Sequence, residues 1–257
     1  MNVSGKTMNS QLLLENIRNV LIRLEETIIF GLIERAQFKT NRVIYTPGAW
    51  PEATGQESIM GFLLHRTECN HSLLRRYTSP DEHPFFSDLP PPALPRLRFD
   101  ENPLLPNQVN LNREIREHYE ASIVPFICQD GDDSQHGSSA VCDVNCLQAL
   151  SKRIHYGKFV AESKYREQPE AFAAAIEAGD CGRLHEMITD RATEERVLRR
   201  VARKALNYGR DLDDGEAGKD CGSPKIQPEQ VVRVYREWII PTTKRVEVLY
   251  LLERLRG

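Results

Sequence analysis

The sequence predicts an all-α protein, a single-domain helical bundle of about ten to twelve helices with no significant β-sheet. Two observations support this prediction. Apolar residues recur three and four positions apart along most of the chain, which is the spacing of one helix face. No stretch shows the sustained alternation of polar and apolar residues typical of half-buried strands. Because no internal repeat divides the 257 residues, one domain over 1–257 is expected.

The N-terminal half of the chain contains three helical patterns and one long loop. Residues 10–38 form a strongly amphipathic pattern, and residues 55–77 form a second. Residues 79–108 contain too many prolines for a helix or a central strand, so a long loop is expected there. Residues 111–127 are again helical in pattern, whereas the polar stretch 130–139 is typical of a loop.

The C-terminal half is expected to hold five helices. Pro241 lies inside the last of them and predicts a kink, because proline lacks the backbone donor that a helix interior uses. The polar, glycine-rich residues 209–225 predict a loop. The five expected helices cover about 140–166, 168–178, 181–189, 191–209 and 228–256.

Composition and charge exclude several classes of function. The chain is 28% charged with a formal net charge of −3, so no basic excess points to nucleic acid. No apolar run approaches about 18 residues, and the N-terminus lacks the apolar core of a secretory signal, so neither a membrane span nor secretion is expected. A cytoplasmic protein is predicted, or a plastid protein if a transit peptide has been removed. The six cysteines form no metal-ligand set and are interpreted as reduced structural thiols.

Two cations lie on an unexpected side of the helix predicted over 140–166. Arg153 and Lys164 fall in the middle of a face that is otherwise small and apolar. They are 11 residues apart, so they point in nearly the same direction, about 16 Å apart along the axis. The opposite side of the helix is interpreted as an ordinary solvent-facing one, made of Lys152, His155, Lys158 and Glu162.

Other helices also place polar groups near apolar faces. Arg18 lies at the border of the apolar stripe of the first helix. Asp190 and Glu194 are four residues apart and share one face, as do Thr243 and Glu247 in the last helix. Each observation has a structural alternative. In these alternatives, Arg18 extends from the edge of the stripe into water, and Asp190 and Glu194 lie on a solvated helix surface. The Thr243 hydroxyl would then bond to the backbone of its own helix.

Considered together, these groups would form a site with three cations, one hydroxyl and two acids. Helical bundles build sites in this way, from side chains of facing helices. Three cations suit a small dianionic ligand, and an arginine binds a carboxylate through paired hydrogen bonds. The set lacks a His or Cys nucleophile and metal ligands, which favours catalysis by positioning and electrostatics. Its members are Arg18, Arg153, Lys164, Thr243, Glu194 and Glu247.

Four stretches of the sequence are characteristic: "NIRNVLIRLEETIIFGLIERAQF", "SPDEHPFF", "DGDD…GSSAVCDVNCLQALSKRIHYGKFVAE" and "IIPTTKRVEVLYLLERL". In these stretches the sequence resembles a known family, the AroQ-type all-α chorismate mutases of the eukaryotic (beta) subclass found in fungi and plants. The resemblance covers about residues 12–256 and implies the rearrangement of chorismate to prephenate, in phenylalanine and tyrosine biosynthesis, without a cofactor. It implies core helices over about 10–38, 140–209 and 228–256, and a regulatory, dimer-forming region over about 39–139.

The resemblance assigns a role to each residue of the predicted site. It implies that Arg18 and Arg153 hold the two carboxylates of chorismate, with Thr243 assisting. It implies that Lys164 and Glu247 address the enol ether oxygen, where negative charge grows as the C–O bond breaks.

For the ring hydroxyl of the substrate, the resemblance implies Glu194 as a partner. A second substrate-binding position, Asp190, holds an aspartate where the fungal pattern has asparagine. This difference leaves open what Asp190 contributes and which charge it carries.

The fungal pattern also implies a homodimer that binds tyrosine or tryptophan between its subunits. The effector-binding arginines of that pattern match Arg75 and Arg76, and its Gly-Ser loop matches Gly137 and Ser138. At two further positions, threonines of the pattern are replaced by Val141 and Gln227. Two alternative functions are kept: a non-catalytic amino-acid-binding homologue, and a secreted mutase that acts on a host's metabolism.

Overall fold

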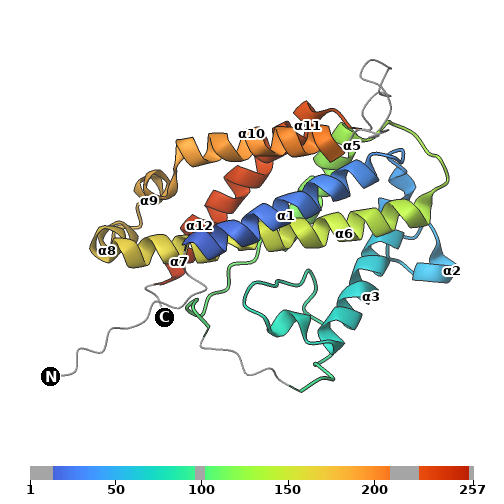
Figure 1. The fold of residues 1–257 in the computed structure, drawn as a ribbon. Coiled ribbons are helices and arrows are strands. Elements are labelled where there is room, and N and C mark those ends of the chain that lie inside the picture. Colours follow the sequence, from blue (N-terminus) through green and yellow to red (C-terminus); the bar gives the residue numbers. More distant parts are fainter. Residues whose placement is uncertain (1–13, 96–101, 209–225, 255–257) are drawn as a thin grey trace, which may run out of the picture.

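The computed structural model describes residues 14–95, 102–208 and 226–254. Within these ranges the chain is helical, with no strand (Figure 1). The α-helices are α1 (Leu14–Arg35), α2 (Pro51–Thr54), α3 (Ile59–Leu73), α4 (Asn112–His118), α5 (Val124–Ile127), α6 (His136–His155), α7 (Gly157–Glu167), α8 (Pro169–Glu177), α9 (Cys181–Ile188), α10 (Arg191–Tyr208), α11 (Pro228–Val234) and α12 (Ile240–Arg254). Two 3₁₀ turns, η2 (Arg42–Tyr45) and η3 (Arg76–Thr78), flank α2 and α3.

The predicted all-α class is confirmed, with corrections of detail. Within the described residues, α4, η4 and α5 form one continuous rod, and so do α11, η5 and α12, so there are fewer separate helices longer than one turn than the ten to twelve expected. α6 begins at His136, so the predicted loop 130–139 is shorter than expected. The helix predicted over 140–166 is interrupted at Tyr156, whose carbonyl accepts a hydrogen bond from the Phe159 N–H, three residues on, at 3.1 Å. Residues 10–13 of the first predicted helix, the predicted loop over 209–225, Cys221 and residues 255–256 lie outside the described residues.

Two rods contain a π-helical turn shortly before a proline. The turn η4 (Tyr119–Ile123) precedes Pro125, and η5 (Tyr235–Ile239) precedes Pro241. A proline has no N–H, and its ring crowds the carbonyl four residues earlier. A wider turn at that point keeps the rod continuous. The kink expected at Pro241 takes this form, as a π turn between α11 and α12.

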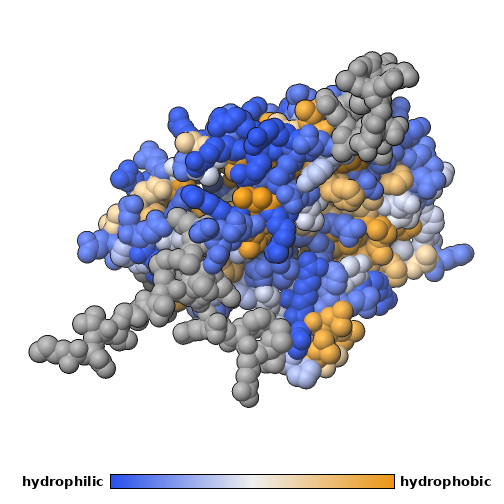
Figure 2. All heavy atoms as spheres, in the orientation of Figure 1, coloured by the Kyte–Doolittle hydropathy of each residue, from blue (hydrophilic) through white to orange (hydrophobic). Residues whose placement is uncertain are grey.

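The long helices pack around a shared apolar core. Figure 1 shows α1 lying along α6, with α10 on the other side of α1 and α12 crossing α7. Most buried apolar residues form one large cluster, and a smaller cluster lies where α7, α8, α9 and α12 meet. Its members include Ile17, Phe159, Leu184 and Leu251. In Figure 2, hydrophilic side chains cover most of the visible face of the molecule. Among the helices of the described ranges, none has the length and apolar character that crossing a bilayer requires.

A buried ionic cluster fixes the end of α1 to the middle of α6. The Arg35 guanidinium donates to the Asp143 carboxylate through Nε at 2.7 Å, and both side chains are fully buried. The hydroxyls of Tyr45 and Tyr119 donate to the same carboxylate at 2.6 and 2.8 Å. Burying an ion pair is costly unless its remaining polar atoms are bonded, and here three donors satisfy one carboxylate.

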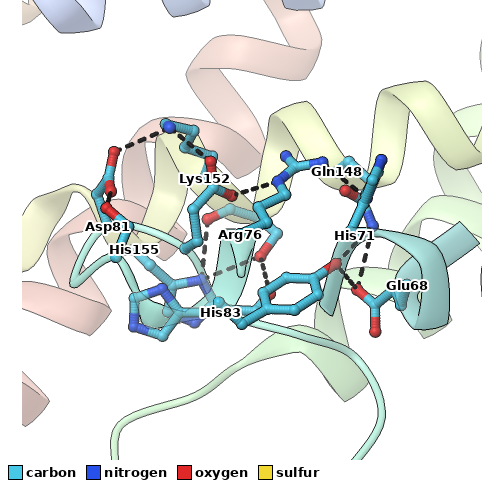
Figure 3. Close-up of polar contacts among 12 residues, drawn as sticks. Glu68, His71, Arg76, Asp81, His83, Gln148, Lys152 and His155 are labelled. Carbon is cyan, nitrogen blue, oxygen red and sulfur yellow. Dashed lines mark hydrogen bonds and ion pairs between the residues drawn. The ribbon is translucent and has the colours of Figure 1, made fainter. Parts of the chain in front are cut away.

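The side of α6 and α7 that was expected to face water is instead buried. His155 and Glu162 are 0% exposed and Lys158 is 3% exposed. This side is covered by residues 79–86, residues 102–111 and the end of α12, which supply its polar partners. Figure 3 shows the part formed by residues 79–86, with Asp81 bonded to Lys152 and His83 beside His155. Polar residues at helical spacing look alike in sequence whether their partner is water or a distant loop, so the prediction was wrong. We name this set the polar stripe: Lys152, His155, Lys158 and Glu162.

Candidate active site

The two inward-facing cations come from consecutive helices, α6 and α7. Arg153 is 5% exposed, and its Nη1 donates to the Thr243 hydroxyl of α12 at 3.4 Å. Its Nε is buried without a hydrogen-bond partner. Lys164 donates to the backbone carbonyl of Ile188, at the end of α9. The prediction that both cations leave the solvated side of their helices is confirmed for Arg153, whereas Lys164 is half-buried.

Helix α12 supplies a hydroxyl and a carboxyl group to the same place. The Thr243 hydroxyl donates to the Ile239 carbonyl at 2.7 Å and accepts from Arg153. Glu247 is 5% exposed, and its Oε2 has no hydrogen-bond partner. Burial raises the pKa of Glu247 to about 7, although Lys164 and Arg153 act in the opposite direction. Near neutral pH this carboxyl group is therefore protonated in a large share of molecules.

A glycine allows α7 and α12 to approach closely at this point. A Cβ atom on Gly157 would lie 3.0 Å from both the Thr243 carbonyl oxygen and its Cγ2. It would also lie 3.2 Å from the Glu247 Cγ. The absence of a side chain at Gly157 thus brings the polar groups of α12 against the junction between α6 and α7.

Helix α10 adds a second carboxylate at the edge of the site. Glu194 pairs with the Lys244 ammonium at 3.0 Å, and that ammonium also donates to the Thr189 hydroxyl at 3.4 Å. Sequence reasoning did not single out Lys244. Its position next to Thr243 was the available signal, but a lysine beside an inward-facing residue is more often a solvated neighbour. The structure makes Lys244 the group that holds Glu194 against α12.

Asp190 caps the first turn of α10. Its carboxylate accepts from the Thr193 N–H at 3.0 Å and from the Thr193 hydroxyl at 2.6 Å. These hydrogen bonds hold the pKa of Asp190 below its ordinary value, so the group is ionised at neutral pH. This answers the question that the sequence left open about its charge.

Arg18 is exposed, although it lies in nearly the same direction around α1 as the buried residues Glu25 and Ile29, seven and eleven positions further on. The predicted position at the border of the apolar stripe therefore agrees with the later turns of α1, but neighbouring helices do not cover that direction at Arg18 itself. Within the described residues, no hydrogen bond or ion pair links Arg18 to the other predicted site residues.

The predicted effector positions are only partly brought together in one chain. Arg76 pairs with Glu82 at 3.0 Å and lines a cavity of about 710 Å³, which Val141 also lines. Arg75, in a left-handed conformation with φ 60°, donates to the Pro95 carbonyl and does not line this cavity. The pair expected to form a loop, Gly137 and Ser138, lies instead in the first turn of α6.

The arrangement around Arg153, Lys164 and Glu247 suits one kind of ligand. A buried guanidinium N–H and a buried carboxyl oxygen both lack partners within the described protein. Leaving such groups unsatisfied costs about 1–3 kcal/mol each, so a ligand that bonds to both is favoured. The cations favour an anionic ligand, and a protonated Glu247 can donate a hydrogen bond. In the part of the chain that is described, no group of three or more His, Cys, Asp or Glu side chains is placed to hold a metal ion.

Comparisons with known proteins agree in family and fold. The model of the family "Chorismate mutase type II" matches residues 136–248. A chorismate mutase of Schizosaccharomyces pombe is 48% identical, over 96% of this chain and 98% of that protein. The Aro7p chorismate mutase of Candida albicans in complex with L-Trp has a TM-score of 0.88 at 38% identity, over 95% of this chain and 92% of that chain. The AtCM1 structure with tyrosine bound in its allosteric site has a TM-score of 0.85 at 43% identity, over 98% of this chain and 99% of that chain.

Proposed function

Because the chain belongs to the chorismate mutase family, which rearranges chorismate to prephenate, we propose that the reaction takes place between α6, α7, α10 and α12. The observation that carries this placement is the pair of buried polar atoms without partners, Arg153 Nε and Glu247 Oε2. Chorismate bears two carboxylates and an ether oxygen, and it can satisfy both atoms. A non-catalytic homologue would gain nothing from keeping them unpaired.

In the proposed site the guanidinium of Arg153 holds a substrate carboxylate through its free N–H groups. Thr243, already bonded to that guanidinium, keeps it oriented. The reaction breaks a C–O bond while a C–C bond forms, and negative charge grows on the ether oxygen. Lys164 and protonated Glu247 donate to this oxygen. Donors placed in advance in a buried site can each contribute about 3 kcal/mol to lowering the barrier.

The edge of the site then addresses the ring hydroxyl of the substrate. Glu194, fixed by Lys244, accepts a hydrogen bond from that hydroxyl. The ionised Asp190 lies at the start of the same helix and adds negative charge near it. Arg18 completes the set by turning from solvent toward the second carboxylate when substrate binds. Together these groups hold the ether in a compact, reactive conformation, which is catalysis by positioning.

The test of this placement is the Arg153→Ala variant. We expect kcat/KM for chorismate to fall at least about 10²-fold, because a charged donor to the substrate is lost. The fold should survive, because the free N–H of Arg153 serves a ligand rather than the core. The control is Arg245→Ala, an exposed α12 arginine paired with Glu114, which should keep parental activity. Full activity in Arg153→Ala, judged on folded protein by circular dichroism, would show that the site is misplaced.

We also propose a homodimer regulated weakly by tyrosine or tryptophan through the region 39–139. Support comes from Arg76 and Val141, which line one cavity, and from the relatives solved with these amino acids. An effector carboxylate has to compete with Glu82 for Arg76, and Val141 lacks the hydroxyl of threonine. We therefore expect modest inhibition. A monomer in light scattering at micromolar concentration would exclude the dimer, and strong cooperative inhibition would exclude the weak regulation.

The proposed cellular location is the cytoplasm. Fractionation of cells of the source organism tests it directly, with mutase activity measured in each fraction. Recovery of the activity in a plastid fraction or in the medium would replace this proposal, the latter in favour of a secreted mutase.

A further inference from the structure

The junction between α6 and α7 carries the two catalytic cations on one side and the polar stripe on the other. Arg153 lies in the last turn of α6, and Lys164 lies in α7, beyond the break at Tyr156. His155 and Lys158 belong to the stripe and lie on either side of the same break. Figure 3 shows the rings of His155 and His83 side by side.

His155 is bonded at both ring nitrogens. Its Nε2 accepts from the Leu111 N–H at 2.9 Å, and its Nδ1 donates to the Ser151 carbonyl at 2.9 Å. This pattern requires a neutral imidazole with the proton on Nδ1. The ring stacks on His83 with centroids 4.3 Å apart. A single side chain thus connects the last turn of α6 to the residue that precedes α4.

Lys158 makes the matching connection from α7. Its Nζ donates to the Val109 carbonyl at 2.6 Å and to His83 Nε2 at 2.7 Å. Burial lowers the pKa of Lys158 to about 8, and Glu253 opposes this shift. The backbone carbonyl of His83 is held in turn by the Asn112 side chain at 2.8 Å. Two loop segments distant in sequence, at His83 and at residues 109–111, therefore meet at the junction and form hydrogen bonds or ring contacts with both helices.

Both helices are therefore held from the side opposite Arg153 and Lys164. The helices are joined only by the turn at Tyr156, so the angle between them depends on what holds each side. Gly157 fixes α7 against α12 on the catalytic side, and the loop segments fix it on the other. A misplacement of about 1 Å in a catalytic group can cost up to about 10²-fold in rate.

We propose that His155 and Lys158 are positioning residues for the mutase reaction, which set the separation of Arg153 and Lys164 by clamping the α6–α7 junction to residues 83 and 109–111. This proposal rests on the proposed function, because it takes Arg153 and Lys164 as the groups that hold the substrate. His155 and Lys158 do not touch the substrate, since they lie on the opposite side of the two helices.

The experiment compares His155→Leu, His155→Gln and Tyr45→Phe. Leucine removes both hydrogen bonds of His155, whereas glutamine keeps a donor and an acceptor. Tyr45→Phe is the matched control, because it removes a hydrogen bond to Asp143 in the middle of α6, about three turns away from His155. Each variant is titrated with prephenate by calorimetry and assayed for kcat/KM with chorismate. Both measurements are made at a temperature at which circular dichroism shows each variant to be fully folded, because reversible unfolding by itself weakens the apparent Kd. Under these conditions a change in Kd reports positioning rather than stability.

We expect His155→Leu to weaken prephenate binding and kcat/KM each about tenfold at unchanged stoichiometry. His155→Gln should recover most of both, and Tyr45→Phe should keep the parental Kd while unfolding at a lower temperature. A parental Kd and parental kcat/KM per folded molecule in His155→Leu would overturn the proposal. The Arg153→Ala variant separates failure of the proposed active site from failure of the proposed positioning role. Parental prephenate binding by Arg153→Ala would reject the site itself. Weakened binding by Arg153→Ala, together with parental binding and activity in His155→Leu, would reject only the positioning role of His155 and Lys158.

Discussion

Replacing Glu247 with glutamine tests the part of the mechanism that depends most on burial. Glu247 is 5% exposed, its Oε2 has no partner, and its pKa is raised to about 7. An ionised carboxylate accepts hydrogen bonds but cannot donate them, so it would repel the charge that grows on the ether oxygen. Glutamine places an N–H donor at nearly the same position and does not titrate.

The size of the effect on activity follows from the pKa of Glu247. A group with a pKa of about 7 is protonated in about 90% of molecules at pH 6, half at pH 7 and about 10% at pH 8. If only the protonated form is active, kcat/KM falls about tenfold per pH unit above 7. At pH 9 the parent should therefore be about 10²-fold below its acid plateau. Glu247→Gln should show no such fall, and Glu247→Ala should be inactive throughout.

The same shift makes the stability of the fold depend on pH. In the unfolded chain the carboxyl group titrates at its ordinary pKa of 4.5, but in the folded chain it titrates at about 7. Between these values the folded state holds a proton that the unfolded state has released, so stability falls as pH rises. At pH 8 the cost is about 3 kcal/mol. Glu247→Gln removes this cost, so the variant should gain up to about 3 kcal/mol over the parent at pH 8, relative to their difference at pH 4.

Both effects can be measured on the same preparations. Chorismate consumption from pH 5 to 9 gives the activity profile, and urea unfolding at pH 4 and 8 gives the stability. A glutamine variant as inactive as Glu247→Ala at pH 6 would refute the donor role, because the parent is protonated there. That outcome would show that Glu247 contributes something other than a hydrogen bond donated to the ether oxygen.

Two further predictions concern residues around the site. In Gly157→Ala the new Cβ lies 3.0 Å from the backbone oxygen of Thr243, so α7 and α12 must separate. We expect the free energy of unfolding measured in urea to fall by about 1–3 kcal/mol, and kcat to fall as well. Parental stability would show that the helices have room to adjust. Burial lowers the pKa of His155 to about 4, whereas a histidine in the unfolded chain titrates near 6.5. Between these values the unfolded chain binds a proton that the folded chain does not, so the free energy of unfolding falls as the pH falls below 6.5. Between pH 8 and 5.5 the parent should lose about 1.4 kcal/mol more of its unfolding free energy than His155→Gln, and identical losses in the two proteins would contradict this.

The sequence by itself determined the helical class and most helix positions. Apolar residues spaced three and four positions apart place α1, α3 and α10 within a few residues of their observed bounds, because a helix face must be apolar wherever it packs on a core. The same reasoning identified Arg153, Thr243 and Glu247 as polar groups on inward-facing sides of their helices. Such groups stand out in sequence because burying them needs a partner.

Tertiary structure alone decided what those partners are and which other polar groups are buried. The stripe through His155, Lys158 and Glu162 is indistinguishable in sequence from a solvated face, and it is buried because distant loops fold over it and donate or accept its hydrogen bonds. The exposure of Arg18 and the pairing of Lys244 with Glu194 depend likewise on how helices cross, which local periodicity does not encode. Burial and pairing arise from segments far apart in the chain, so only the packed molecule determines the pKa of Glu247 and the shape of the site.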